Sequence, residues 1–136
     1  MRILALDIGR KRTGIAATDA TGTIASPVKV LPSNEVFDNA KTFRRVIEDY
    51  EPELLVVGLP VSLDGNENDH AKWVREVADK ISAATSIPVE FQDERLTSSE
   101  AKRIMRDEGL SERDMRGKLD MVAASLILEA YIDGNR

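Results

Sequence analysis

The order of the predicted strands is the feature that most constrains the fold. Three strand-like segments come first, over residues 2–7, 13–18 and 23–31, and only short turns separate them. Consecutive strands with short turns form an antiparallel meander. Because Pro27 cannot donate a ladder hydrogen bond, we expect the third strand to lie at an edge of the sheet or at a bulge.

After residue 31 the apolar residues recur either at helical spacing or in short unbroken runs. These patterns predict, in chain order, a helix over 36–49, a strand over 54–58, a helix over 67–84, a strand over 88–91, a helix from Ser98 to Gly109, and a helix from about Lys118 to Asp133. Strands that are joined through helices run parallel. The expected fold class is therefore α/β, with a mixed five-stranded sheet that contains an antiparallel three-stranded meander and carries helices on its faces.

The composition narrows the class of protein. A chain of 136 residues suits one domain with its own core, over residues 1–136. The absence of cysteine excludes disulfides and thiolate zinc sites and fits a reducing compartment. No apolar run approaches the ~20 residues of a membrane span, and the first residues form a strand instead of a signal peptide. We therefore expect a cytoplasmic protein.

The net charge of −5 argues against a general nucleic-acid binder, but the charges are unevenly placed. Basic residues gather at positions 10–12 and between 95 and 118, where seven Lys or Arg stand against five Asp or Glu. One interpretation is a locally basic face on an acidic body. The other is a solvated helical face with mixed charges, and charge alone favours this second interpretation.

Asp7 is the first candidate functional residue. It ends an apolar strand, and a turn with Gly9 and three cations, Arg10, Lys11 and Arg12, follows it. A carboxylate at the mouth of a strand either holds a metal ion or orients a phosphate, whereas the plain alternative is a charged hairpin turn. On Asp-x-Gly alone the two interpretations have equal weight, because such turn signals are common.

Acidic residues at two further places in the chain favour the functional interpretation of Asp7. Asp93 and Glu94 end the last predicted strand, and Asp120 borders the apolar stripe of the final helix, where an unpaired charge would be costly. Taken alone, Asp120 is better explained as a helix N-terminal acid that the helix dipole favours. Strand ends and a helix start do, however, converge at one end of an α/β sheet, where ligands bind.

Three carboxylates at one place suit the hard ions Mg²⁺ or Mn²⁺. Paired ions of this kind activate a water and stabilise the leaving oxygen in phosphodiester hydrolysis. Asp93 shares its side of the strand with Val89 and Phe91, which are expected to face the core, so Glu94 is favoured as the residue that reaches the cleft. Nearby cations would contact phosphates, namely Arg10, Lys11, Arg12, Arg95 and Lys118.

Four motifs in order make the chain similar to a known family. They are Asp7-x-Gly-x-x-Arg12-x-Gly14, then Val57-Gly58-Leu59-Pro60 with Asp64-Gly65, then Asp93-Glu94-Arg95-Leu96-Thr97, and finally Lys118-x-Asp120-x-x-Ala123-Ala124-x-x-Ile127-Leu128. In this order and length they resemble the YqgF family, the Holliday-junction-resolvase-like proteins described as pre-16S rRNA nucleases. The resemblance covers nearly the whole chain and implies a ribonuclease H-like fold.

The resemblance also implies site residues and a cofactor. The acidic positions of the family fall on Asp7, Asp93, Glu94 and Asp120 as catalytic residues, of which Asp7, Glu94 and Asp120 would bind Mg²⁺ or Mn²⁺. The cations beside these acids, Arg12, Arg95 and Lys118, are expected to bind the substrate. Two positions depart from the family pattern: Ser98 replaces a threonine, and Thr13 replaces a branched apolar residue. We expect the second change to alter packing and not chemistry.

The function implied is that of a hydrolase, a metal-dependent nuclease in maturation of the 5′ end of precursor 16S rRNA during ribosome biogenesis. Its expected partners are structured RNA and pre-ribosomal particles, and it would be a monomer or a weak homodimer. Two alternatives stay open: a Holliday junction resolvase that acts on branched DNA, and a non-catalytic RNA-binding assembly factor. An actin-like or sugar-kinase ATPase also carries Asp-x-Gly in its first hairpin, but it needs two such lobes.

Three aromatic residues have plain interpretations. His70 is the only histidine, and at a polar helix start it is expected to be a surface residue and not a general base. Trp73 and Phe43 are expected to be core residues and not platforms for base stacking, because large aromatic side chains are buried on average.

Overall fold

The computed structural model describes residues 1–62, 64–94 and 97–135, although the side chains of 97–99, 112 and 116 lie outside that description. Five strands form one sheet in the order β3-β2-β1-β4-β5. The strands are β1 (Ile3–Ile8), β2 (Arg12–Thr18), β3 (Ala25–Pro32), β4 (Leu54–Leu59) and β5 (Val89–Asp93). The helices are α1 (Ser33–Phe37), α2 (Lys41–Tyr50), α3 (Asp69–Thr85), α4 (Thr97–Asp107) and α5 (Glu112–Gly134).

The sheet is mixed, as the sequence predicts. β1 pairs antiparallel with β2, and β2 pairs antiparallel with β3, whereas β1, β4 and β5 run parallel. In the β2–β3 register Ile15 lies opposite Lys29 but Ala16 lies opposite Pro27, so the pairing skips one residue of β3 beside the proline. β3 is therefore an edge strand with an irregularity at Pro27, which confirms the prediction made for that residue.

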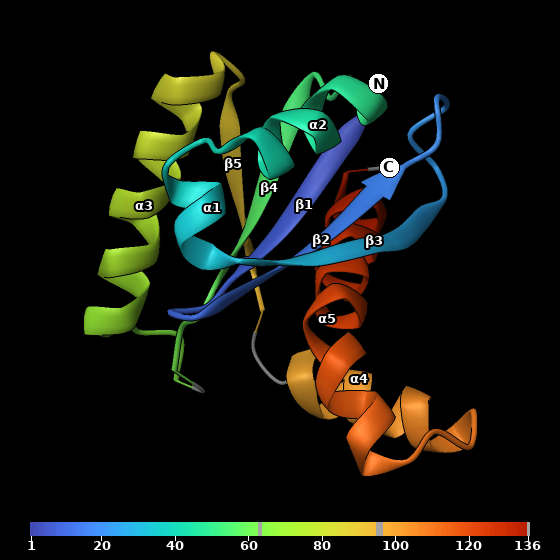
Figure 1. The fold of residues 1–136 in the computed structure, drawn as a ribbon. Helices are drawn as coiled ribbons and strands as arrows, with labels where there is room; N and C mark the ends of the chain where they lie inside the picture. The colour runs from blue at the N-terminus through green and yellow to red at the C-terminus, as the bar shows by residue number, and fades with distance from the viewer. Residues whose placement is uncertain (63, 95–96, 136) are drawn as a thin grey trace.

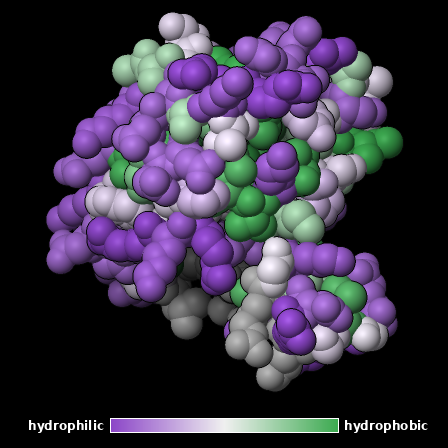
Figure 2. Space-filling view, in the orientation of Figure 1, coloured by the Kyte–Doolittle hydropathy of each residue, from purple (hydrophilic) through white to green (hydrophobic). Residues whose placement is uncertain are grey.

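The helices cover both faces of the sheet (Figure 1). α1, α2 and α3 lie on one face, α5 lies on the other, and α4 packs against α5. The surface seen in the same orientation is largely hydrophilic over α1, α2 and α3 (Figure 2). Within the part of the chain that is described, no helix is long and apolar enough to cross a membrane.

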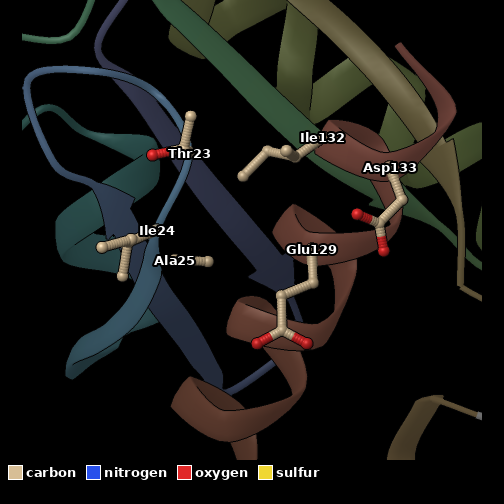
Figure 3. A pocket seen from close by; sticks show the side chains of 6 residues that line it. All are labelled: Thr23, Ile24, Ala25, Glu129, Ile132 and Asp133. Carbon is tan, nitrogen blue, oxygen red and sulfur yellow. The ribbon is translucent and has the colours of Figure 1, made fainter. Parts of the chain in front are cut away.

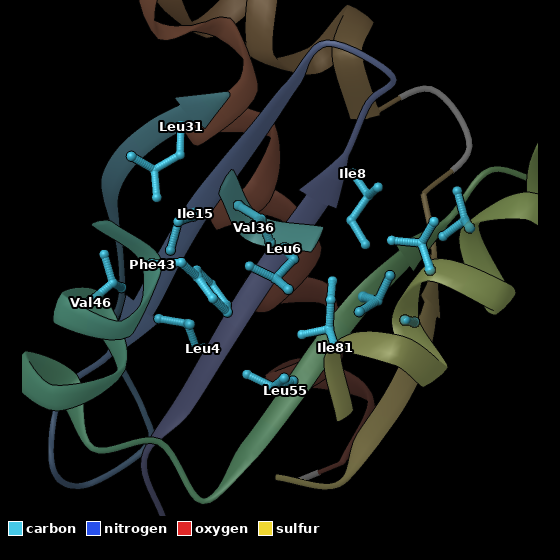
Figure 4. Close-up of a cluster of buried hydrophobic side chains, with 14 of the residues drawn as sticks. Leu4, Leu6, Ile8, Ile15, Leu31, Val36, Phe43, Val46, Leu55 and Ile81 are labelled. Atoms are coloured by element: carbon cyan, nitrogen blue, oxygen red, sulfur yellow. The ribbon is translucent and has the colours of Figure 1, made fainter. Parts of the chain in front are cut away.

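Alternation along β1 divides the core between the two faces. Leu4, Leu6 and Ile8 belong to the cluster beneath α1, α2 and α3, where Phe43 is fully buried (Figure 4). Ile3 and Ala5 belong to the cluster beneath α5, together with Ala16, Val56, Ala124 and Ile127. Burial of each large apolar side chain stabilises the fold by about 1.5–3 kcal/mol. The small residues on the α5 side let that helix approach the sheet closely.

The structure differs most from the predicted helices at two places. The helix predicted over 36–49 is two helices, α1 and α2, because Asn39 adopts a left-handed backbone conformation with φ 51° between them. The final helix begins at Glu112 instead of about Lys118, because the Ser111 side chain caps it by accepting a hydrogen bond from the backbone N–H of Asp114.

A buried hydrogen-bond chain ties the β1–β2 turn to α1. The Thr13 hydroxyl lies 2.8 Å from the Ser33 hydroxyl, which donates to the carbonyl oxygen of Gly9 at 2.6 Å. The backbone N–H of Ser33 donates to the carbonyl oxygen of Lys11 at 2.9 Å. Both hydroxyls are fully buried, so each needs such a partner. Thr13 therefore exchanges apolar packing for a hydrogen bond that holds the turn in place.

Gly14 lies at the closest approach between α5 and the sheet. A Cβ atom at this position would lie 1.9 Å from the carbonyl oxygen of Asp120 and 2.7 Å from the backbone nitrogen of Met121. Real Cβ atoms essentially never approach backbone atoms below 3.0 Å. The backbone of α5 therefore rests directly on β2, and only glycine permits this contact.

We expect Gly14→Ala to destabilise the fold by at least ~1–3 kcal/mol, the usual cost of overpacking, because α5 must move outward to admit the methyl group. Urea denaturation followed by circular dichroism measures the free energy of unfolding. Gly117→Ala is the matched control, since a Cβ at Gly117 meets nothing within 4 Å. That change should stabilise α5 by roughly 0.5–1 kcal/mol. A Gly14→Ala variant as stable as the parent would show that the close contact does not exist.

Candidate active site

Asp7 occupies a gap in the side-chain layer beneath α5. It shares its face of β1 with Ile3 and Ala5, which pack under α5. Its partner on β2 is Gly14, and the pairing of Leu6 with Val57 places Gly58 beside it on β4. Both lateral neighbours of Asp7 therefore lack a side chain. This leaves room around the carboxylate that an ordinary strand position would not have.

Glu94 fills part of this room. Its backbone N–H donates to the carbonyl oxygen of Leu59 at 3.3 Å, which holds it just beyond β5. A Cβ atom at Gly58 would lie 2.7 Å from Glu94 Oε2 and 2.5 Å from Ile127 Cδ1. The side chains of Asp7 and Glu94 are hydrogen-bonded to each other. Gly58 therefore gives the Glu94 carboxyl group its place beside Asp7.

Asp120 approaches from α5. It is not a helix N-terminal acid, because α5 begins at Glu112, two turns earlier, so that interpretation is wrong. Its backbone rests on Gly14, and its Oδ2 atom lies 3.3 Å from Nε of Arg12. The Asp120 side chain is 25% exposed, whereas that of Arg12 is 61% exposed. Arg12 therefore supplies from solvent the cation that a half-buried acid requires.

The environment raises the pKa of all three acids. Burial raises the pKa of Glu94 to about 9, and the charge of Asp7 adds to this effect. Burial raises the pKa of Asp7 to about 6, although the hydrogen bond from Glu94 acts in the opposite direction. Burial also raises the pKa of Asp120, with Arg12 opposing the shift. At neutral pH the Glu94 carboxyl group therefore keeps its proton and donates it to the Asp7 carboxylate.

The donor chemistry fits a hard divalent cation. Carboxylate oxygens are the ligands that Mg²⁺ and Mn²⁺ prefer. In the structure the proton of Glu94 and the guanidinium group of Arg12 reduce the negative charge of the three acids, which a bound ion would also do. Among the residues that the structure describes, no three acids are close enough together to surround one metal position. Asp120 is paired with Arg12 instead. The structure thus brings Asp7 and Glu94 into contact and places Asp120 beside them.

Asp93 does not join this group. It follows Val89 and Phe91 in the alternation of β5, and both pack against the cluster beneath α1, α2 and α3. Its charge still acts on Glu94 and contributes to raising the pKa of that residue. Of the two neighbouring acids, Glu94 is therefore the one that lies with Asp7.

The predicted cations and aromatic residues have different surroundings. Lys118 is exposed on α5, and Arg95 lies outside the described residues. Phe43 is a fully buried core residue, as predicted. Trp73 is only half-buried, but it packs against the core cluster, so the prediction of a core residue is confirmed in part. His70 is partly exposed and stacks on Trp73.

The hollow in Figure 3 is distant from these acids. It measures about 310 Å³ and lies between the start of β3 and the last turns of α5, lined by Thr23, Ile24, Ala25, Glu129, Ile132 and Asp133. Asp7 and Arg12 flank the turn at the other end of β1 and β2. This hollow therefore takes no part in the candidate active site.

The raised pKa values predict how stability depends on pH without metal. The folded chain keeps protons on Asp7 and Glu94 that the unfolded chain has lost above its ordinary values of 3.8 and 4.5. Stability contributed by these protons is lost as pH rises towards the folded values of about 6 and about 9. We expect urea denaturation in EDTA to show a smaller free energy of unfolding at pH 9 than at pH 5.

Glu94→Gln isolates this effect, because glutamine has no proton to lose in this range. Its free energy of unfolding should fall less than that of the parent between pH 5 and pH 9. Glu129→Gln makes the same chemical change at the far end of α5 and should keep the pH dependence of the parent. Identical pH profiles for the parent and Glu94→Gln would show that Glu94 is not protonated in the folded chain.

Comparison with known proteins identifies relatives over the full length. The family model described as RuvX, Holliday junction resolvase, matches residues 1–134. A protein of Anaeromyxobacter sp. (strain Fw109-5) named "Putative pre-16S rRNA nuclease" is 37% identical over 134 residues, which cover 98% of each chain. A protein of the same name from Thermosynechococcus vestitus is 38% identical over 131 residues, which cover 96% of this chain and 87% of the relative.

Solved structures share the fold at low identity. The RuvC protein of T. thermophilus in complex with a Holliday junction substrate matches with a TM-score of 0.59 and 14% identity, over 99% of this chain and 96% of that one. The fowlpox virus resolvase in complex with Holliday junction DNA matches with a TM-score of 0.57 and 15% identity, over 99% of both chains. These matches confirm the expected ribonuclease H-like fold. With the family model and the curated relatives, they establish that this chain belongs to the YqgF family of resolvase-like nucleases, whose family model is described as RuvX.

Proposed function

We propose that this chain is a metal-dependent nuclease that hydrolyses phosphodiester bonds in the maturation of the 5′ end of precursor 16S rRNA. The observation that carries the proposal is the hydrogen-bonded pair of Asp7 and Glu94 at the end of the sheet, with Asp120 beside it. The names of the curated relatives support the choice of substrate. The proposal treats residues 1–136 as one nuclease domain and assigns it to the cytoplasm, where a ribosomal RNA precursor would be processed.

In this proposal Asp7, Glu94 and Asp120 bind Mg²⁺ or Mn²⁺. When bound, such ions activate a water and stabilise the leaving oxygen of a phosphodiester. Glu94 must give up its proton to become a ligand, so metal affinity is expected to increase with pH. Asp93 does not bind metal in this scheme, and its catalytic role is limited to the charge that it places beside Glu94.

Arg12 has two successive partners in this proposal. Its guanidinium group pairs with Asp120 and is mostly exposed. A cation bound by Asp120 would balance the charge that Arg12 now balances, which would leave the guanidinium group free for a phosphate of the substrate. Lys118 is exposed on the same helix as Asp120 and is proposed as a second cation for the strand, with Arg95 as a third.

A second candidate function is the resolution of Holliday junctions. The description of the family model and the fold shared with two resolvases bound to junction DNA favour it. A resolvase that cuts a two-fold symmetric junction must act as a dimer, whereas the rRNA function is compatible with a monomer or a weak homodimer and with pre-ribosomal particles as partners. A non-catalytic assembly factor is the third candidate, and a chain that binds RNA without cutting it would support that function.

Divalent metal should raise thermal stability. Binding to the folded state alone adds about 2.7 kcal/mol at an ion concentration of 100 times Kd. The melting temperature should rise with Mg²⁺ or Mn²⁺, and Asp7→Asn should lose most of this rise because it removes one anionic ligand. Asp49→Asn, which removes an exposed carboxylate of α2, should respond like the parent. Equal responses of Asp7→Asn and the parent would remove Asp7 from the ligand set.

Cleavage should depend on Glu94 and not on Asp93. Single-turnover assays with a precursor 16S rRNA 5′ end and with a four-way DNA junction, each in Mg²⁺ and in Mn²⁺, measure the rate and identify the substrate. Asp7→Asn and Glu94→Gln should each lower the rate by more than the ~10–100-fold that loss of an outer partner of a metal site costs. Asp93→Asn should keep most of the activity.

The result that would reverse this assignment is a fully active Glu94→Gln beside an inactive Asp93→Asn. Circular dichroism spectra show whether each variant is folded. A folded parent that cuts neither substrate with either ion would refute the nuclease proposal.

A further inference from the structure

A second group of interacting side chains lies on the other side of the β1–β2 turn. The guanidinium carbon of Arg10 lies 4.2 Å from the ring centroid of Trp73 in α3, which is a cation–π contact. The rings of His70 and Trp73 are stacked, with centroids 5.4 Å apart and an interplanar angle of 19°. Phe37 meets Trp73 edge-on at 5.7 Å. The aromatic group therefore gives Arg10 a rigid support.

The charge of Arg10 is not neutralised by this support. Among the described residues no carboxylate pairs with it, and its side chain lies in an exposed position. The acids of the loop before α3 have other partners. Glu67 pairs with Arg75 at 2.7 Å, and Asp64 accepts hydrogen bonds from Ser62 and Asn66. Arg10 thus keeps a full positive charge that is available to an anion.

The turn directs its two arginines to opposite sides of Asp7. Arg12 follows the α5 face and pairs with Asp120, whereas Arg10 reaches the opposite face and Trp73. The turn between them is closed by a hydrogen bond of 3.0 Å from the N–H of Gly9 to the carbonyl oxygen of Arg12. The Ser33 hydroxyl also binds the Gly9 carbonyl oxygen. A chain of phosphates that crosses Asp7 would therefore meet a cation on each side.

We propose that Arg10, held against Trp73, is a further phosphate-binding residue for the nucleic-acid strand, and that it acts on the α3 side of the cleavage position, opposite Arg12. The ligand is the phosphodiester backbone, which RNA and DNA share. This inference rests on the proposed function, because it assumes that the strand crosses Asp7. Arg10 contacts the substrate directly. Trp73 is a positioning residue, since its ring restricts a long side chain that would otherwise lose rotamer entropy on binding.

The test measures nucleic-acid binding as a function of salt. All variants carry Asp7→Asn, which prevents cleavage, and the probes are the precursor 16S rRNA 5′ end and the four-way DNA junction. Each phosphate contact contributes about 0.9 to the slope of log K against log salt for duplex DNA and about 0.7 for single strands. Arg10→Gln should reduce the slope by that amount on the probe that the chain prefers. Arg2→Gln removes the same charge at the far end of β1, where Arg2 pairs with Glu51, and should leave the slope unchanged.

Trp73→Leu separates positioning from contact. It keeps an apolar side chain against the core but removes the cation–π support, so it should weaken binding by part of the loss seen in Arg10→Gln. The double variant should bind no more weakly than Arg10→Gln alone, because Trp73 acts only through Arg10. Losses that add in the double variant would assign Trp73 a separate role and overturn the positioning assignment.

Failure of this inference differs from failure of the proposed function. If the parent binds and cuts a probe while adding Arg10→Gln leaves the salt slope of the Asp7→Asn chain unchanged on both probes, the Arg10 phosphate contact is refuted and the nuclease proposal stands. If neither the parent nor the Asp7→Asn chain binds RNA or DNA, and the parent cuts neither, both proposals are refuted. Arg10→Gln alters an exposed side chain, so its result does not depend on whether Trp73→Leu folds.

Discussion

The contact between the backbone of α5 and Gly14 is the constraint on which the rest of the site depends. It fixes how closely α5 approaches the sheet, and with it the height of Asp120 above β2. Gly58 has the corresponding role on β4, where its missing side chain admits the carboxyl group of Glu94. Asp7 lies between these two glycines, so the strand pairing and the contact with α5 together place Asp120 beside the Asp7–Glu94 pair.

This arrangement carries an electrostatic cost. Burial raises the pKa of Asp7, Glu94 and Asp120, so the folded chain would be more stable without at least one of these charges. A proton on Glu94 and the Arg12 guanidinium relieve the repulsion. Such local destabilisation is expected where a site is shaped for a ligand and not for the stability of the empty fold. The apolar core on both faces of the sheet stabilises the fold and offsets this electrostatic cost.

Much of the fold could be predicted from sequence because its signals are local. The three-stranded meander before the β-α units predicts the mixed sheet, and strand alternation at Val89 and Phe91 distinguishes Glu94 from Asp93. The roles of Gly14 and Gly58 could not be found in this way, since they depend on which residues become neighbours across strands. The break at Asn39 was missed because apolar spacing continues through it. The contact of Arg10 with Trp73 joins residues far apart in sequence, and no local pattern indicates it.

The β1–β2 turn links the buried hydrogen bonds of the fold to the cations of the candidate site. Thr13 and Ser33 are both buried, and their hydroxyl groups are satisfied by each other and by the Gly9 carbonyl oxygen, which holds the turn against α1. That position directs Arg12 towards Asp120 and lets Arg10 reach Trp73. The Thr13 hydroxyl, at a position where the resemblance implies an apolar residue, is therefore satisfied inside the fold. The same hydrogen bonds hold the turn that carries Arg10 and Arg12, the two exposed cations on either side of the acidic pair.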